Sequence, residues 1–292
     1  MNRDLEGLAA RAAPAVFVVL WSTGFIATKY ALGGAEPLTY LAIRMAVVVG
    51  LMAIIVAITR PQWPDRAGIA HSVVAGLLVH GFYLGGTAVA IAHSIPAGLS
   101  ALIPGLQPIL TSTLANRWLG ERVTPLQWSG LLLGLVGVVL ILHDRPMGGE
   151  AGWGWLASAV SLVSITLGTL YQRRFCGRID WRSGNLVQYI AVTVLFAAAA
   201  WQFESNVVHW TAEFMLSIAW LAVVLSVGTI ALFYWLIRRS AATAVASLFY
   251  LVPTVTAVMA YALFGERLDA VAILGMAACA AAVFLVNRRA RI

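Results

Sequence analysis

Charged side chains are scarce in this chain, and their scarcity excludes a water-soluble domain. Only 11% of the 292 residues are charged, whereas 61% are hydrophobic and the mean hydropathy is +0.88. A soluble domain carries roughly 25% charged residues. The chain is therefore predicted to lie in a lipid bilayer, and lipid is one of its expected partners.

Cysteine and histidine are also rare, which argues against several classes of chemistry. Cys176 in a link and Cys279 in the last apolar stretch make no plausible disulfide framework. The five histidines lack the spacing of metal ligands and have no carboxylate beside them at membrane depth. An enzyme, a metal site and a cofactor are therefore not expected.

Carboxylates are missing from the apolar stretches. All twelve, from Asp4 to Asp269, lie in the tails, in links or at the edges of those stretches. Proton-driven multidrug pumps commonly place Glu or Asp at membrane depth, so weak or absent proton coupling is predicted. His80 is the one midplane group that titrates near neutral pH, either as a neutral hydrogen-bond partner or as a coupling site.

Ten apolar stretches are present, each about long enough to cross ~30 Å of hydrocarbon as an α-helix. They cover residues 13–32, 37–59, 67–92, 95–116, 125–142, 152–172, 183–203, 214–237, 241–263 and 270–287. Arg3 and Arg11 precede the first stretch as in a signal peptide, but the following spans favour an uncleaved helix. The predicted fold class is an all-α integral membrane protein with ten transmembrane helices.

The basic residues predict the orientation of these helices. Fifteen of the 19 fall on one side if the helices alternate. These are Arg3, Arg11, Arg60, Arg66, Arg117, Arg122, Arg173, Arg174, Arg178, Arg182, Arg238, Arg239, Arg288, Arg289 and Arg291. By the positive-inside rule both termini are expected in the cytoplasm. The net charge of +7 then reflects topology, and nucleic-acid binding is not expected.

One segment is written twice. PILTSTLANRWLGER at 108–122 returns as PTVTAVMAYALFGER at 253–267, 145 residues later, with six of fifteen positions identical. Five predicted helices separate the copies, and an odd number turns the second copy upside down. The chain is therefore predicted to form two inverted five-helix repeats, 1–146 and 147–292, around a central cavity. Many secondary transporters use this arrangement for alternating access.

These residues also resemble a known family. Trp21, Gly24 and Lys29, the segment EPLTYLAIR at 36–44 and the two Pro…Gly-Glu-Arg segments are similar to the drug/metabolite transporter superfamily, in its ten-helix EamA-type branch. The resemblance covers nearly the whole chain. It implies a bacterial inner-membrane carrier that exports small metabolites.

Within that branch the chain is most similar to the YddG-type exporters of aromatic amino acids. The function expected is export of amino acids, aromatic and other neutral ones. The alternative is an exporter of cationic drugs or of other small metabolites from the same superfamily.

Polar and aromatic side chains at helical spacing predict where the solute binds. They form stripes on the third, fourth, sixth and ninth stretches, with additions from the first and eighth. The candidates for substrate binding are Trp21, His80, Tyr83, Ser100, Gln107, Ser164, Tyr171, Trp235, Ser247, Phe249 and Tyr250. The alternatives are hydrogen bonds between helices for the polar groups and interfacial belt positions for several aromatic ones.

Two prolines lie roughly at the middle of their predicted helices. Pro108 and Pro253 each remove a helical hydrogen bond and leave a carbonyl free, so they are candidate hinges or substrate contacts. A packing kink is the alternative. Gly120 and Gly265 are expected as left-handed helix caps, and the acidic and basic residues after them as structural groups at the interface.

Two basic residues lie within predicted helices. Lys29 is expected either to meet a carboxylate at the outer mouth or to extend to the interface. Arg44 is expected as a structural ion pair, with Glu36 two turns before it, or as a ligand of carbonyl oxygens. Gly130, Gly134 and Gly137 allow close backbone approach, either between the repeats or in a homodimer.

Overall fold

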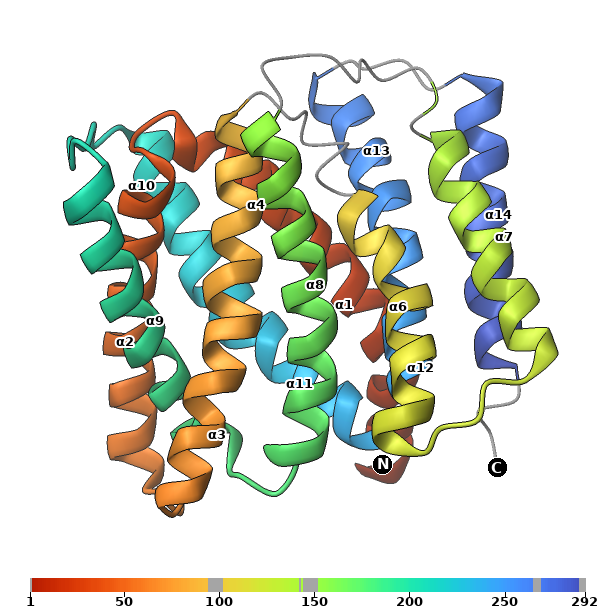
Figure 1. Ribbon diagram of the computed structural model, residues 1–292, viewed down its shortest axis with the longest axis horizontal. Coiled ribbons are helices and arrows are strands. Elements are labelled where there is room, and N and C mark those ends of the chain that lie inside the picture. Colours follow the sequence, from red (N-terminus) through yellow and green to blue (C-terminus); the bar gives the residue numbers. More distant parts are fainter. Residues whose placement is uncertain (1, 94–101, 142, 144–151, 265–268, 289–292) are drawn as a thin grey trace.

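The computed structural model describes residues 2–93, 102–141, 143, 152–264 and 269–288, and these residues form a bundle of helices (Figure 1). Apart from one isolated bridge between Ala35 and Val208, the described backbone is helical or in links. Seven helices are single elements: α1 (Asn2–Leu32), α2 (Pro37–Thr59), α6 (Leu102–Leu119), α7 (Pro125–Ile141), α8 (Gly152–Phe175), α9 (Trp181–Phe203) and α14 (Ala270–Asn287).

Three further helical stretches change their winding along the way. The first consists of α3 (Arg66–Gly76), the π-helix η1 (Leu77–Phe82) and α4 (Tyr83–Ala92). The second consists of α10 (Ala212–Ala219), the π-helix η2 (Trp220–Thr229) and α11 (Ile230–Arg239). The third consists of α12 (Ala242–Ser247), the 3₁₀ turn η3 (Leu248–Tyr250) and α13 (Leu251–Phe264).

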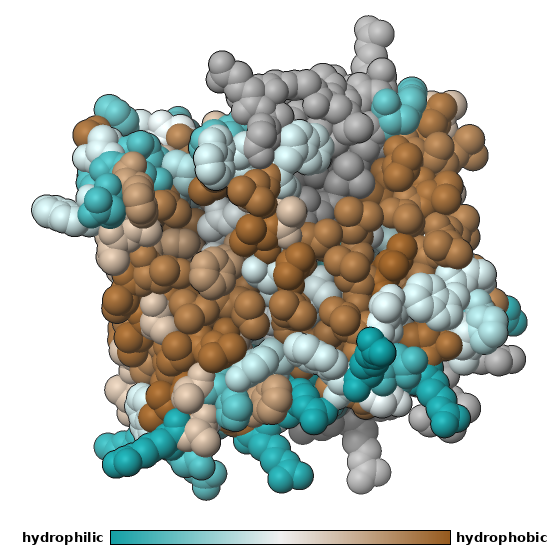
Figure 2. Space-filling view, in the orientation of Figure 1, coloured by the Kyte–Doolittle hydropathy of each residue, from teal (hydrophilic) through white to brown (hydrophobic). Residues whose placement is uncertain are grey.

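The bundle has the length and the surface of a multi-pass membrane protein. Eight helical stretches in the described part of the chain are long and apolar enough to cross a membrane, and α7 is apolar but shorter. Figure 2 shows a continuous apolar band between two polar margins on the face in view. Exposed apolar side chains such as Ile58 (76% exposed) and Trp201 (82% exposed) would be costly in water, so lipid must cover the apolar surface of the bundle.

Helix α2 begins at Pro37, where sequence and tertiary structure agree. Proline at the first helical position has no N–H that needs a partner. The next two N–H groups, of Leu38 and Thr39, donate to the Glu204 carboxylate at 2.8 and 2.7 Å. Glu204 follows α9, so this cap also ties the ends of α9 and α2 together. The two helices pack along their length around buried Tyr40, Met45 and Tyr189.

Glu121 has the corresponding role at the other side of the bundle. Its carboxylate accepts from the N–H of Ala242 at the start of α12, at 2.9 Å, and pairs with Arg173 at 3.0 Å. Gly120 before it has φ +68°, which confirms the predicted left-handed cap. Gly265 lies outside the described residues.

Helices α7 and α14 lie side by side at one edge of the bundle (Figure 1). Gly137 and Gly275 bring the backbones together: a Cβ on Gly275 would lie 2.6 Å from the Gly137 carbonyl oxygen. At the other end of the contact, a Cβ on Gly130 would lie 3.0 Å from the Leu285 side chain. The helices are therefore antiparallel, and the predicted close approach of glycines occurs between two helices of the same chain.

Candidate functional site

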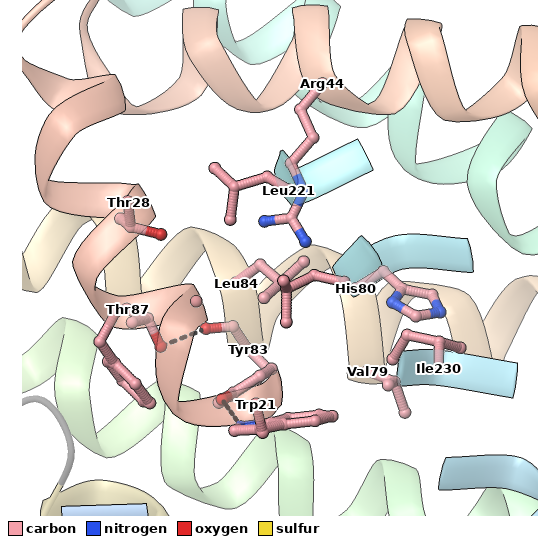
Figure 3. A pocket seen from close by; sticks show the side chains of 13 residues that line it. Trp21, Thr28, Arg44, Val79, His80, Tyr83, Leu84, Thr87, Leu221 and Ile230 are labelled. Atoms are coloured by element: carbon pink, nitrogen blue, oxygen red, sulfur yellow. Dashed lines mark hydrogen bonds between the residues drawn. The ribbon is translucent and has the colours of Figure 1, made fainter. Parts of the chain in front are cut away.

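A central cavity lies where α1, α2, η1, α4, η2 and the start of α11 meet (Figure 3). Its volume is about 50 Å³, enough for a few water molecules but far below the roughly 300–1,000 Å³ of typical ligand pockets. It is lined by Trp21, Gly24, Phe25, Thr28, Arg44, Val79, His80, Tyr83, Leu84, Thr87, Leu221, Leu225 and Ile230. In this conformation the cavity is thus too small for a solute of the size that such pockets usually bind.

Trp21 and Tyr83 form one wall of the cavity. The indole Nε1–H of Trp21 donates to the Tyr83 hydroxyl at 3.2 Å, and the two rings stack with centroids 6.1 Å apart. Behind Trp21, the rings of Phe249 and Phe233 lie 5.1 and 5.5 Å away. Such ring pairs contribute about 0.5–1.5 kcal/mol each beyond their buried area. The wall is therefore a packed aromatic cluster with one polar contact inside it.

Both π-helices border the cavity. His80 lies in η1, and Leu221 and Leu225 lie in η2. In η2 the hydroxyl of Ser226 donates to the carbonyl of Leu221, five residues earlier, at 3.0 Å. π-Helical turns occur frequently at functional sites. Sequence reasoning missed both of them, because the apolar pattern of an α-helix and that of a short π turn do not differ enough to be told apart.

Arg44 is the charged group of the cavity. It is only 5% exposed, and its Nε and Nη2 donate to the Ser226 hydroxyl at 3.1 and 3.0 Å. A further hydrogen bond joins it to Tyr40. Glu36, the expected partner, instead accepts from Ser205 N at 2.7 Å. The Ser205 hydroxyl and N–H hold the pKa of the Glu36 carboxyl below its usual value. The predicted Arg44–Glu36 pair is therefore wrong.

His80 begins a chain of side-chain hydrogen bonds. The Tyr234 hydroxyl donates to Gln188 Oε1 at 2.9 Å, and His80 Nε2 lies 3.3 Å from the same hydroxyl. Since a phenol has one proton, His80 must donate through Nε2. Gln188 Nε2 then donates to Gln172 Oε1 at 3.2 Å. The chain ends at a second pocket, lined by Gln172, Arg173, Gly177, Tyr234, Ile237 and Arg238.

The other predicted site residues lie away from the central cavity. Gln107 donates to the Thr169 hydroxyl at 3.1 Å, and the Tyr171 hydroxyl lies 2.7 Å from His71 Nδ1. Trp235 stacks under the Arg239 guanidinium, 4.7 Å from the ring centre. Of the predicted residues that the structure describes, Trp21, His80 and Tyr83 line the cavity.

On the ninth stretch the polar stripe faces neighbouring helices. Ser247 accepts from Asn287 Nδ2 of α14 at 3.0 Å, and the Tyr250 hydroxyl donates to the Leu131 carbonyl of α7 at 2.6 Å. Phe249 is fully buried in the aromatic cluster. Ser164 is buried on α8, and Ser100 lies outside the described residues.

The two prolines lie in different local structures. Pro108 is inside α6, whereas Pro253 is the third residue of α13, directly after the 3₁₀ turn η3. The Ser22 hydroxyl of α1 approaches the carbonyl of Val252, next to Pro253, at 3.4 Å. The change in winding before Pro253 places Phe249 against Trp21.

Replacing Pro253 with alanine is expected to slow transport by several-fold without lowering the melting temperature. The new N–H favours a continuous α-helix through η3, which shifts Phe249 away from the cavity wall. Transport rates and melting temperatures of purified protein measure both effects. Pro14→Ala, at a proline inside α1, is the matched control. Transport by the Pro253 variant at the wild-type rate contradicts the hinge.

Comparisons with known proteins give the class. Residues 13–143 and again 152–288 match the EamA-like transporter family, so the chain belongs to that family. It is therefore a membrane transporter and not an enzyme.

Similar proteins cover nearly the whole chain. An "Uncharacterized transporter YvbV" of Bacillus subtilis is 28% identical over 95% of this chain and 91% of its own length. A "Probable terminal-alkyne amino-acid exporter" of Streptantibioticus cattleyicolor is 27% identical over 93% and 91%. A solved crystal structure superposes with a TM-score of 0.78 at 24% identity, over 97% and 98%, which shows the fold alone.

Proposed function

We propose that the protein exports small organic metabolites, above all neutral amino acids including aromatic ones, by alternating access. The observation that carries this proposal is the small central cavity, which the Arg44 charge, the His80 and Tyr83 polar groups and the Trp21 ring line between helices long enough to cross a membrane. Polar side chains at such depth are costly unless they serve a solute pathway or a packed interior. A similar protein named as an amino-acid exporter supports the substrate class.

Two inverted five-helix repeats, and hence ten membrane-spanning helices, are part of the proposal. Equivalent positions of α7 and α14 are 145 residues apart, and the Cys279 thiol approaches the carbonyl of Gly134, its own equivalent, at 3.7 Å. Gly130 of α7 lies against Leu285 of α14, and Gly275 of α14 lies against Leu140 of α7. Gly130 and Gly275 are equivalent positions, as are Leu140 and Leu285, so each helix makes the same contact with the other. A two-fold axis between antiparallel α7 and α14 produces this pattern. The two successive family matches support the duplication.

The π-helices support the same relation. Shifting η1, Leu77–Phe82, by the repeat offset gives a segment that falls within η2, Trp220–Thr229. Both repeats thus carry irregular winding at the same position, beside the cavity. Because π turns interrupt the regular α-helical hydrogen bonds and occur frequently at functional sites, we infer that these two segments move when the cavity opens.

Proton coupling is expected to be weak. Glu204 caps a helix, and Glu121 caps another and pairs with Arg173, all near helix ends. His80 uses its Nε2 proton in the chain to Tyr234 and Gln188, and an amide in such a chain does not relay protons. The protein is therefore proposed as a facilitator in the bacterial inner membrane with both termini in the cytoplasm.

Transport by purified protein in proteoliposomes tests this proposal. Uptake of radiolabelled neutral amino acids, dipeptides and cationic drugs is measured with and without a pH gradient. Saturable uptake of amino acids that a pH gradient alone does not concentrate is the expected result. Uptake of cationic drugs without amino acids favours the alternative substrate class, and accumulation driven by a pH gradient contradicts the facilitator mechanism.

A further inference from the structure

We propose that Arg44 binds the carboxylate of the transported solute, so that the substrates are carboxylic acids carrying an apolar side chain. This inference rests on the proposed function and names the group that selects the substrate. Four observations support it: the Arg44 guanidinium is buried, it points into the cavity, the equivalent residue of the second repeat is neutral, and the rest of the cavity lining suits an amino acid.

The Arg44 charge is buried without a counter-ion in the described part of the chain. Its partners there are the hydroxyls of Ser226 and Tyr40, both neutral. The nearest carboxylate in sequence, Glu36, is occupied by Ser205, and Glu204 is occupied by the N-terminus of α2. Burial of an unpaired charge costs several kcal/mol. A bound carboxylate removes that cost, whereas a solute without an anionic group does not.

The guanidinium points into the cavity. Figure 3 shows the Arg44 side chain extending from α2 until its nitrogen atoms lie between Leu221 and Leu84. A guanidinium has five N–H groups in a planar fork that fits a carboxylate with two parallel bonds. Ser226 and Tyr40 leave part of this fork unused. The remaining N–H groups are available to a solute in the cavity.

Packing alone does not require a charge at this position. Helices α2 and α9 pack against each other, and an offset of 144 residues superposes their ends and their buried positions, so Arg44 of α2 corresponds to Gln188 of α9. Gln188 is fully buried and its amide bonds to Gln172 and to the Tyr234 hydroxyl. The second repeat thus holds the same position with a neutral amide. Arg44 therefore departs from the symmetry between the repeats, and the departure occurs at a residue that lines the cavity.

The other surfaces of the cavity suit the rest of an amino acid. Trp21 and Ile230 supply apolar area for a side chain, whereas the Thr28 hydroxyl, on the Arg44 side in Figure 3, can accept from an ammonium group. An amine that lacks a carboxylate would meet the Arg44 charge directly and be repelled. The site therefore discriminates between amino acids and cationic drugs.

The substrate series on the wild-type protein is the first test. L-phenylalanine, or another neutral amino acid if the transport panel identifies one, competes with its carboxamide and with the corresponding amine for uptake into proteoliposomes. We expect the amide and the amine to bind at least tenfold more weakly than the acid. Equal competition by acid and amide overturns the role of Arg44 but leaves amino-acid export intact. Uptake of amines without amino acids overturns both.

Variants provide the second test. Arg44→Gln removes the charge, and we expect it to bind acid and amide equally, whereas Arg44→Lys retains a preference for the acid at reduced affinity. Arg60→Gln, at the exposed end of α2, is the control and keeps the wild-type preference. If Arg44→Gln still prefers the acid tenfold, the proposal is wrong. If Arg44→Gln does not fold, as judged by gel filtration, the wild-type competition series and the Arg44→Lys variant test the proposal in its place.

Discussion

Trp21→Ala is expected to reduce transport more than tenfold, the largest effect on activity of any single change at the cavity wall. Trp21 is 6% exposed and supports Tyr83 through its indole N–H, so its loss removes both the wall and the bond that holds the tyrosine. Removing a buried Trp also costs about 3–5 kcal/mol of folding stability. The transport rate must therefore be normalised to the folded fraction measured by gel filtration.

Two further variants separate activity from stability in this experiment. Trp21→Phe keeps a ring beside Phe249 but loses the hydrogen bond to Tyr83, so it should fold well and transport at an intermediate rate. Trp201→Ala, at an 82% exposed position on α9, should behave as the wild type. Wild-type transport by folded Trp21→Ala protein would exclude this wall from the solute pathway.

Gly275→Ala is expected to lower stability by about 1–3 kcal/mol, and Gly275→Val by more, because the added atoms overpack a backbone contact. A Cβ at Gly275 would lie 2.6 Å from the Gly137 carbonyl oxygen and 2.8 Å from the Ile141 nitrogen. Backbone atoms of a helix cannot move aside individually, so α7 and α14 would have to separate. The melting temperature in detergent measures the loss.

Gly50→Ala is the matched control for this prediction. It lies within α2, and a Cβ there would meet nothing within 4 Å. Alanine in a helix interior is favoured over glycine by roughly 0.5–1 kcal/mol, so no loss of stability is expected. Equal melting temperatures for Gly275→Ala and the wild type would contradict the close antiparallel contact of α7 and α14.

The sequence predicted where helices begin and end with good accuracy. Two predicted stretches, 37–59 and 270–287, coincide with α2 and α14. Helix α1 begins at Asn2, 11 residues before the predicted start at 13, and the other described ends differ by at most three residues. This accuracy has a physical cause: a membrane span must be long, apolar and bounded by polar groups, and each of these conditions is local. The expectations for Ser100 and Gly265 fall outside the described residues.

The site was harder to predict because helical spacing shows that polar groups share a face but not what that face meets. The stripe of Ser247 and Tyr250 faces α14 and α7, whereas His80 and Tyr83 face the cavity. Nothing in the spacing separates these cases. Arg44 was expected either to pair with Glu36, two turns before it, or to bind carbonyl oxygens; Ser205, far away in sequence, holds Glu36 instead.

The sequence by itself thus determined the solvent of this protein, the positions of its helices and the duplicated segment, since composition and period are properties of a single stretch of chain. Only the tertiary structure decided which helix faces enclose a cavity, where the winding changes to π and which buried charge lacks a partner. These depend on contacts between residues as distant as Arg44 and Ser226, and such contacts leave no trace in the order of the residues around either of them.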